Sequence, residues 1–319
     1  MKHKPAILFV QLGTPEAPTK KSLKKYLKEF LSDKRVVDLA PILWKMILHF
    51  SILRKRPQKS AELYKEIWTD EGSPLRVITE KQVAYFKDQV KEDVSVEYAM
   101  RYGSPSIREK LIEFKFKEVD QIYIVPLYPQ YSSSTTGSVV EEVYKTIQHF
   151  RYIPSVKICD PFYLQDFYID GFIRNIRKAF KEKLFDYLLL SYHGIPKRYA
   201  TLGDPYNKMC RATTDRITEK LGDTSYRIIH CYQSRFGKEE WLKPYTDVAT
   251  EVVSGEIAVV SPSFVSDCLE TTHELGIELK IDYENGELTL IPCLNDEKQW
   301  LEGFKDYIKL DAPSWNLFR

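Results

Sequence analysis

The chain has 319 residues, of which 43% are hydrophobic and 29% charged, and its formal net charge is +2. This balance excludes the strongly one-signed field of a nucleic-acid-binding surface, and no stretch reaches the length of about 18 apolar residues that a membrane-spanning helix requires. The 5 cysteines, none spaced as C-x-x-C, favour reduced thiols in the cytoplasm over a disulfide framework or a zinc site.

Short β-rich runs alternate with longer stretches of helical periodicity along the whole chain. Strands are predicted over residues 6–11, 94–99, 122–127, 156–159, 187–191, 228–231, 257–261 and 277–282. Helices are predicted over residues 20–31, 60–68, 77–90, 139–150, 164–180, 206–221, 267–275 and 296–309, and the tail 310–319 is expected to be loose. The alternation indicates an α/β protein whose parallel sheets are built from βαβ units, with the strands divided into two sets of four.

One early segment combines apolar and basic character. Residues 41–57, PILWKMILHFSILRKRP, are apolar almost all round and then abruptly basic. One interpretation is a buried helix with a cationic end. The other is an apolar lip over residues 42–53 beside Arg54, Lys55 and Arg56, which would suit a flat anionic ligand or a membrane surface.

A histidine stands at the end of a predicted buried strand. The run DYLLLSYHGIP, residues 186–196, reaches His193, after which Gly194 and Pro196 turn the chain. Ligands of open α/β sheets bind outside the carboxyl ends of the strands. A lone histidine is more often structural than catalytic, so its position by itself leaves both roles open.

Carboxylates follow the next strand end, in SPSFVSDCLETTHELG, residues 261–276. Asp267, Glu270 and Glu274 fall at i, i+3 and i+7, which predicts three carboxylates on one helix face. Such a row suits the transport of protons or a hard cation. The affinity of a helix N-terminus for acids also explains Asp267 and Glu270 without any function.

Several collinear segments, taken together, resemble the ferrochelatases, enzymes that insert ferrous iron into a porphyrin. The resemblance runs over nearly the whole chain and is stronger to bacterial than to eukaryotic members. The segments are LGTPEAP, FLSDKRVVDL, IWTDEGSPL, MRYGSPSI, PLYPQYSSSTTGS, LLLSYHGIP, GDPY, CYQSRFGKEEWLKP and SFVSDCLETTHELGIE.

The resemblance implies two Rossmann-like domains, each a four-stranded parallel sheet flanked by helices, with the porphyrin in a cleft between them. We predict domains over residues 1–160 and 161–297, and leave open that the C-terminal helix 298–309 packs back on the first. His193 matches the family's essential histidine and Glu270 its partner glutamate, while Asp267 and Glu274 match an acidic proton path. The positions that match porphyrin contacts are Leu12, Arg56, Tyr64, Ser73, Arg101, Tyr128, Tyr206, Trp241 and Phe264.

Imidazole and carboxylate groups can accept pyrrole protons or hold the incoming metal. Both roles therefore stay open for His193 and Glu270, and we favour His193 as the proton acceptor. Cys268 stands where many members have histidine, and Gln11 where asparagine is common. No cysteine follows Cys293, and Ser133 occupies a cluster-ligand position of the eukaryotic type, so no [2Fe–2S] cofactor is expected.

The predicted activity is insertion of ferrous iron into protoporphyrin IX, with release of two protons, as the last step of heme biosynthesis. One alternative is a coproporphyrin ferrochelatase, although those members tend to carry tyrosine at the position of Leu12. Another is a tetrapyrrole carrier without catalysis, which would need neither His193 nor Glu270. The expected location is cytoplasmic, with peripheral contact at the inner face of the plasma membrane left open.

Overall fold

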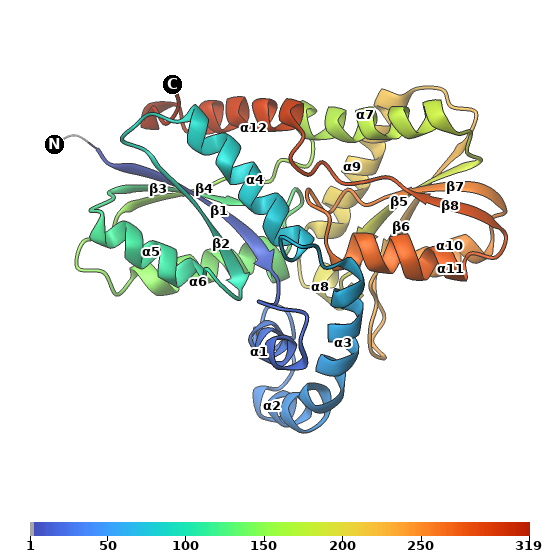
Figure 1. Cartoon of the computed structure of the whole chain (residues 1–319), viewed down its shortest axis with the longest axis horizontal. Coiled ribbons are helices and arrows are strands. Elements are labelled where there is room, and N and C mark those ends of the chain that lie inside the picture. Colours follow the sequence, from blue (N-terminus) through green and yellow to red (C-terminus); the bar gives the residue numbers. More distant parts are fainter. Residues whose placement is uncertain (1–2) are drawn as a thin grey trace. The chain divides into compact units, whose positions relative to one another are not determined.

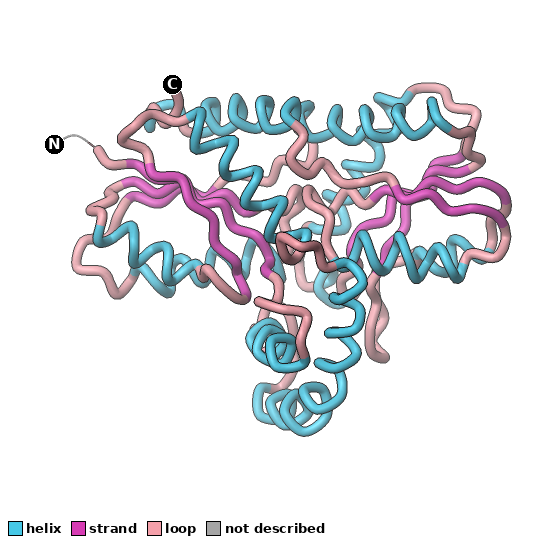
Figure 2. Tube along the Cα trace, in the orientation of Figure 1, coloured by secondary structure: helices cyan, strands magenta, loops and turns pink. Residues whose placement is uncertain are grey.

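The structure is a computed structural model that describes residues 3–319. The chain forms two compact units, and each is built around one four-stranded parallel sheet (Figure 1). The first unit comprises the residues up to Tyr128, Ser132–Asp160 and Lys305–Arg319, and the second comprises Pro129–Tyr131 and Pro161–Phe304. Helices enclose the strands of each unit on both faces, so the predicted α/β class with two parallel sheets is confirmed (Figure 2).

The sheet of the first unit has the strand order β2-β1-β3-β4. Its strands are β1 (Pro5–Gly13), β2 (Ser95–Tyr102), β3 (Gln121–Pro126) and β4 (Ser155–Ile158). Its helices are α1 (Lys20–Leu31), α2 (Pro41–Ile47), the π-helical η1 (Leu48–Ile52), α3 (Leu53–Ile67), α4 (Pro74–Gln89), α5 (Ile107–Phe116), the π-helical η2 (Ser133–Gly137) and α6 (Ser138–Ile147). Helix α4 lies on one face of the sheet and α5 and α6 lie on the other (Figure 1).

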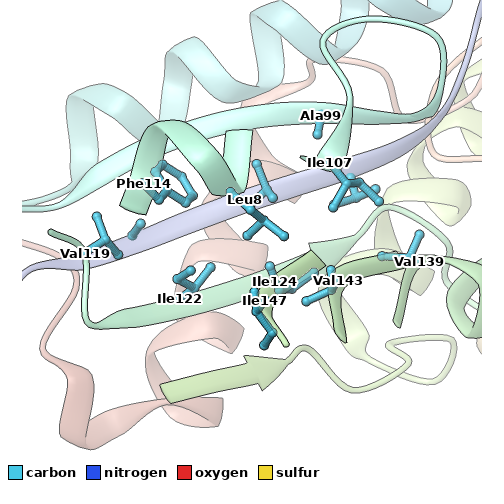
Figure 3. Packing of buried hydrophobic residues seen from close by; sticks show 13 residues of the cluster. Leu8, Ala99, Ile107, Phe114, Val119, Ile122, Ile124, Val139, Val143 and Ile147 are labelled. Atoms are coloured by element: carbon cyan, nitrogen blue, oxygen red, sulfur yellow. The ribbon is translucent and has the colours of Figure 1, made fainter. Parts of the chain in front are cut away.

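The core of this unit follows from the apolar residues that recur on one face of each element. Figure 3 shows strand residues such as Leu8 and Ile124 packed with Phe114 of α5 and Val143 of α6. All four side chains are fully buried, with no more than 1% of their surface exposed. This packing holds the sheet rigid, so the loops at its carboxyl edge start from fixed points.

The sheet of the second unit has the equivalent order β6-β5-β7-β8. Its strands are β5 (Tyr187–His193), β6 (Arg227–Gln233), β7 (Gly255–Val260) and β8 (Gly286–Leu290). Its helices are α7 (Asp166–Glu182), α8 (Lys197–Thr201), α9 (Tyr206–Leu221), α10 (Thr246–Glu251), the π-helical η3 (Leu269–Glu278) and α11 (Leu279–Asp282). The last helix, α12 (Lys298–Asp311), contributes residues to both units, and a short 3₁₀ turn, η4 (Pro313–Trp315), follows it.

The prediction of a strand over residues 277–282 is wrong. The alternation in IELKID is that of a half-buried strand, but these residues complete η3 and form α11. Leu275 and Leu279, four residues apart, pack into the core, whereas Ile281 is 73% exposed. The strand comes later, as β8, where residues 286–290 pair with β7. A short apolar run is compatible with both helical and strand periodicity, and here tertiary packing favours the helix.

The expectation of a loose tail is also wrong. Leu317 and Phe318 are buried, with 2% and 5% of their surface exposed. The backbone N–H of Arg319 donates to the Gln89 carbonyl, and the N–H of Lys91 donates to the Leu317 carbonyl. The tail is therefore held against the end of α4, because termini are ordered when backbone bonds and buried side chains hold them.

Candidate active site

The strand order places the candidate residues at a topological switch point. In the second unit, β5 lies between β6 and β7, so the chain passes from β5 to β6 on one side and then crosses back to β7 on the other side. Ligands of open α/β sheets bind outside the carboxyl ends of the strands at such a point. His193 is the last residue of β5, and the loop after β7 leads to η3, whose second residue is Glu270. The two residues named from the sequence therefore meet at one sheet edge.

The backbone around His193 determines which ring nitrogen carries the proton. His193 Nδ1 lies 2.6 Å from the carbonyl oxygen of Gly194. A carbonyl only accepts, so Nδ1 donates and Nε2 of the neutral ring keeps its lone pair. The His193 backbone N–H donates to Ser263 Oγ at 2.9 Å, which fixes the end of the strand. The neutral ring is thus held as a proton acceptor or metal ligand through Nε2.

Burial favours the neutral form of this imidazole. Desolvation lowers the pKa of His193 from its ordinary value, and the charge of Glu270 and the hydrogen bond to Gly194 oppose that effect. A ring that is neutral near pH 7, yet has a carboxylate close by to stabilise the imidazolium, is suited to accepting a proton.

Gly194 is required by close packing. Its N–H donates to the Gln233 carbonyl at 2.8 Å, and a Cβ there would lie 2.8 Å from that oxygen and 3.1 Å from the Trp241 ring. Phe264 meets the His193 ring edge-on, with centroids 6.1 Å apart. The structure thus places Trp241 and Phe264 beside His193. Tyr206, also buried, has a phenol pKa that burial raises well above its usual value, so it stays protonated.

A row of glutamates runs along η3, although it differs from the predicted row. Glu270, Glu274 and Glu278 are spaced four residues apart, and residues four apart are neighbours on a helix surface. Glu270 and Glu274 are half-buried and Glu278 is exposed. The pKa of Glu274 is raised to about 7, chiefly by burial and also by the neighbouring Glu270 and Glu278, against the hydrogen bond from Ser234, which lowers it. Sequence reasoning missed Glu278, which the i, i+4, i+8 spacing could have indicated.

The prediction that Asp267 shares this helix face is wrong. The helix begins at Leu269, and the Asp267 carboxylate accepts hydrogen bonds from Asn295 Nδ2 at 2.7 Å, Thr271 Oγ1 at 3.1 Å and the Cys293 N–H at 3.3 Å. These bonds tie the start of η3 to the segment after β8. Cys268 is buried, and burial together with Glu270 raises the pKa of its thiol well above the usual value, so it is a neutral neighbour of Glu270.

The first unit places some of the predicted porphyrin contacts at the end of β1. Leu12 is half-buried there, and Thr14 Oγ1 donates to Ser73 Oγ at 2.7 Å, which joins β1 to the start of α4. Tyr64 is buried against Trp68, whereas Arg56 is exposed on α3. Their contact with porphyrin stays a prediction.

Arg101 has an internal role that the sequence did not indicate. Its guanidinium forms an ion pair with Asp33 at 2.7 Å, and its Nε donates to Ser138 Oγ at 2.6 Å. Tyr102 and Ser138 donate to the same Asp33 oxygen. The hydroxyl of Tyr128 is buried with no hydrogen-bond partner among the described residues, and burial raises its pKa.

The segment 42–53 presents an exposed apolar surface rather than a buried helix. We name this surface the lip. Its members, with their exposed fractions, are Ile42 (80%), Leu43 (55%), Met46 (49%), Ile47 (39%) and Phe50 (66%). Leu48 is buried at 1%, so it is not part of the lip. The Arg54 guanidinium lies 5.6 Å from the centroid of the Phe50 ring. Within residues 3–319, no helix has the length and apolarity needed to span a membrane.

Comparisons with known proteins agree with this geometry. The ferrochelatase family model matches residues 4–311. A ferrochelatase of Thioalkalivibrio sulfidiphilus is 40% identical over 97% of this chain and 87% of its own, and one of Shewanella denitrificans is 43% identical over 97% and 98%. The solved structure of SirB from Bacillus subtilis with Fe3+ superposes with a TM-score of 0.59 at 10% identity, covering 99% of this chain and 100% of that one. CbiX, described as the terminal enzyme for siroheme biosynthesis in denitrifying bacteria, gives 0.51 at 12% identity, over 97% and 99%. At such identities the two structures show a shared fold alone.

Proposed function

The chain belongs to the ferrochelatase family, whose members insert iron into a porphyrin in heme biosynthesis, and we propose that its substrates are protoporphyrin IX and ferrous iron. We further propose His193 as the acceptor of the pyrrole protons. The observation that carries this assignment is the bond from His193 Nδ1 to the Gly194 carbonyl, which leaves Nε2 as the acceptor.

The reaction requires the site to move two protons. Ferrous iron takes the place of two pyrrole N–H protons, so a neutral porphyrin and a dication give neutral heme and two protons. Nε2 of His193 takes a pyrrole proton, and Glu270 stabilises the imidazolium that forms. Glu274 has a pKa of about 7, so near neutral pH it both accepts and releases protons. We therefore propose that protons leave along Glu270, Glu274 and Glu278, towards the exposed end of η3.

Iron also accepts nitrogen and oxygen ligands, so His193 and Glu270 are suited to contact the incoming ion. The remaining site residues bind the porphyrin in this proposal. The aromatic residues assigned to this role in the second unit are Tyr206, Trp241 and Phe264, while Leu12, Ser73 and Tyr128 lie in the first unit. Arg56 is exposed and cationic, which suits a propionate. We expect no resident [2Fe–2S] cluster, and iron and acid-labile sulfide measured in the purified protein would test this.

The central experiment compares His193→Ala with Glu270→Gln. Each variant should bind porphyrin, measured by fluorescence quenching, but lose metallation under anaerobic ferrous iron by about 10²–10⁴-fold, the loss expected for a general base. His230→Ala is the matched control, because this histidine lies on β6 of the same sheet and pairs with Leu190 rather than with His193. Turnover of His193→Ala within about threefold of wild type would show that the histidine is structural.

Choice of porphyrin needs its own measurement. Leu12 at the end of β1 supports protoporphyrin over coproporphyrin, through the resemblance described above. Turnover measured side by side on the two porphyrins tests this directly, and a preference for coproporphyrin would overturn the assignment of substrate while leaving the metallation chemistry in place.

We also propose that the protein works in the cytoplasm and that the lip attaches it peripherally to an anionic membrane surface. The five apolar members of the lip are exposed on one short stretch of helix. Helix α1, whose Leu31 carbonyl accepts a hydrogen bond from Trp44 Nε1 of α2, carries exposed lysines that add positive charge, among them Lys21, Lys24 and Lys28. Apolar insertion together with attraction to anionic lipid is the pattern of an interfacial helix.

The test uses vesicles of phosphatidylcholine with and without phosphatidylglycerol. Ile42→Ser together with Phe50→Ser should reduce sedimentation of the protein with anionic vesicles. Phe116→Ser is the matched control, because Phe116 is 81% exposed but lies on α5. Equal binding of wild type and the double variant would show that the lip does not contact membranes.

A further inference from the structure

Gln233, the last residue of β6, forms hydrogen bonds with the backbone of Glu270 and of Gly194, the residue that follows His193. It is the register partner of His193 on β5, and its backbone carbonyl accepts from the Gly194 N–H at 2.8 Å. Its side-chain Nε2 donates to the Glu270 carbonyl at 2.8 Å. One residue thus joins the end of the histidine's strand to the first turn of the glutamate's helix.

The side-chain amide of Gln233 has three hydrogen-bond partners: Ser191, Ser261 and the Glu270 carbonyl. Its Oε1 accepts from Ser191 Oγ at 2.8 Å and from Ser261 Oγ at 3.3 Å, and these serines lie on or just after the neighbouring strands β5 and β7. Gln233 is only 4% exposed, and the two serines no more than 1%. Because the Glu270 carbonyl only accepts, the amide orientation is determined. A buried polar network of this kind, fully satisfied, rigidifies the groups that it joins.

The next residue, Ser234, contacts the second glutamate of the row. Its Oγ donates to the Glu274 carboxylate at 2.5 Å. Ser234 has a φ of 66°, a left-handed conformation that costs energy for any residue except glycine. No glycine stands there, although glycine would remove that cost. The conformation turns the chain after β6 so that consecutive side chains reach Glu270 and Glu274.

We propose that Gln233 and Ser234 are positioning residues that hold η3 so that Glu270 faces His193 and Glu274 continues the row. This inference rests on the proposed catalytic role of Glu270. Groups that orient catalytic or metal-binding side chains typically change activity by about 10–100-fold when they are removed, since a displacement of about 1 Å at a reacting group costs up to about 10²-fold.

The experiment separates positioning from stability. Gln233→Met keeps the length of the side chain but removes the amide, and should lower kcat by about 10–100-fold while porphyrin affinity, measured by fluorescence quenching, stays within twofold. Asn175→Leu is the matched control, because Asn175 lies on α7 and its Nδ2 likewise donates to backbone carbonyls, those of Pro292 and Cys293 at 3.2 Å. It should lower the unfolding temperature and leave kcat within twofold.

Ser234→Gly provides the second arm. Glycine removes the hydroxyl and also the backbone cost, so the unfolding temperature should be unchanged or higher while kcat falls. The inference is overturned if Ser234→Gly and Gln233→Met both keep wild-type kcat while Glu270→Gln is inactive. It is also overturned if Asn175→Leu loses as much turnover as Gln233→Met. Full activity of Glu270→Gln would instead refute the proposed role of Glu270.

Discussion

Replacing Asp33 by alanine should destabilise the first unit by about 3–5 kcal/mol, because it leaves a buried arginine without its counter-ion. The Asp33 and Arg101 side chains are only 8% and 14% exposed, and their charged atoms are 2.7 Å apart. The same carboxylate accepts from the Tyr102 hydroxyl at 2.8 Å, from Ser138 Oγ at 2.5 Å and from the Arg35 N–H at 2.8 Å. Asp33→Asn keeps the shape but loses the charge, and should cost about 1.5–3 kcal/mol, the value of one charged hydrogen bond.

Urea unfolding followed by circular dichroism measures these losses. The double variant Asp33→Ala with Arg101→Leu should cost less than the sum of the single variants, since it removes both charges together. Glu16→Ala is the control, because the Glu16–Lys25 pair is 54% and 66% exposed on its two sides and should contribute less than about 1 kcal/mol. A loss below about 1 kcal/mol for Asp33→Ala would refute the reasoning.

The pH dependence of this stabilisation follows from the same contacts. Burial alone would raise the pKa of the Asp33 carboxyl, but hydrogen bonds from Ser138, Arg35 and Tyr102, with the charge of Arg101, hold it below its ordinary 3.8. A carboxyl whose pKa is lower in the folded state stabilises the fold at pH values above its pKa in the unfolded chain. This stabilisation is lost as the pH falls into the acid range. The difference between wild type and Asp33→Asn should therefore be constant at neutral pH and shrink below pH 3.8.

Two further predictions concern single side chains. The pKa of Glu274 is raised from 4.5 to about 7, so the folded state binds this proton more tightly than the unfolded chain does. The resulting contribution to stability is lost as the pH rises from 4.5 to about 7. Glu274→Gln should flatten the dependence of unfolding temperature on pH between these values, and an unchanged slope would contradict the raised pKa. Arg101→Leu should weaken porphyrin binding as well as stability, if a propionate reaches it; unchanged affinity in fluorescence titration would leave Arg101 with its ion pair to Asp33 alone.

The sequence predicted much of the fold because short-range patterns encode it directly. Helices α1 and α9 begin and end at the predicted residues, since apolar spacing and their capping residues act locally. The strand ending at His193 was predicted from its continuous apolar run and the Gly194 turn, the signature of a strand buried on both faces. Local patterns failed at residues 277–282, where alternation in the sequence coexists with a helical face that buries Leu279.

The candidate site was predicted only in part. His193 and Glu270 were named, but the predicted lip over residues 42–53 includes Leu48 and Leu53, which are buried, with 1% and 2% of their surface exposed. Periodicity shows that a helix has an apolar face. It does not show which apolar residues remain exposed to solvent once the neighbouring elements have packed.

The sequence by itself determined the α/β alternation, the two sets of strands and the family, and it proposed His193 and Glu270 as site residues, because each of these follows from patterns in contiguous residues. Only the tertiary structure decided the strand order that makes β5 and β7 neighbours, the bounds of η3, which exclude Asp267 and include Glu278, and the bonds from Gln233 and Ser234. The physical reason is that these features depend on hydrogen bonds between residues about 40 positions apart in sequence, as in the pairs Gln233–Glu270 and Ser234–Glu274, which form only once β5, β6 and β7 have packed side by side.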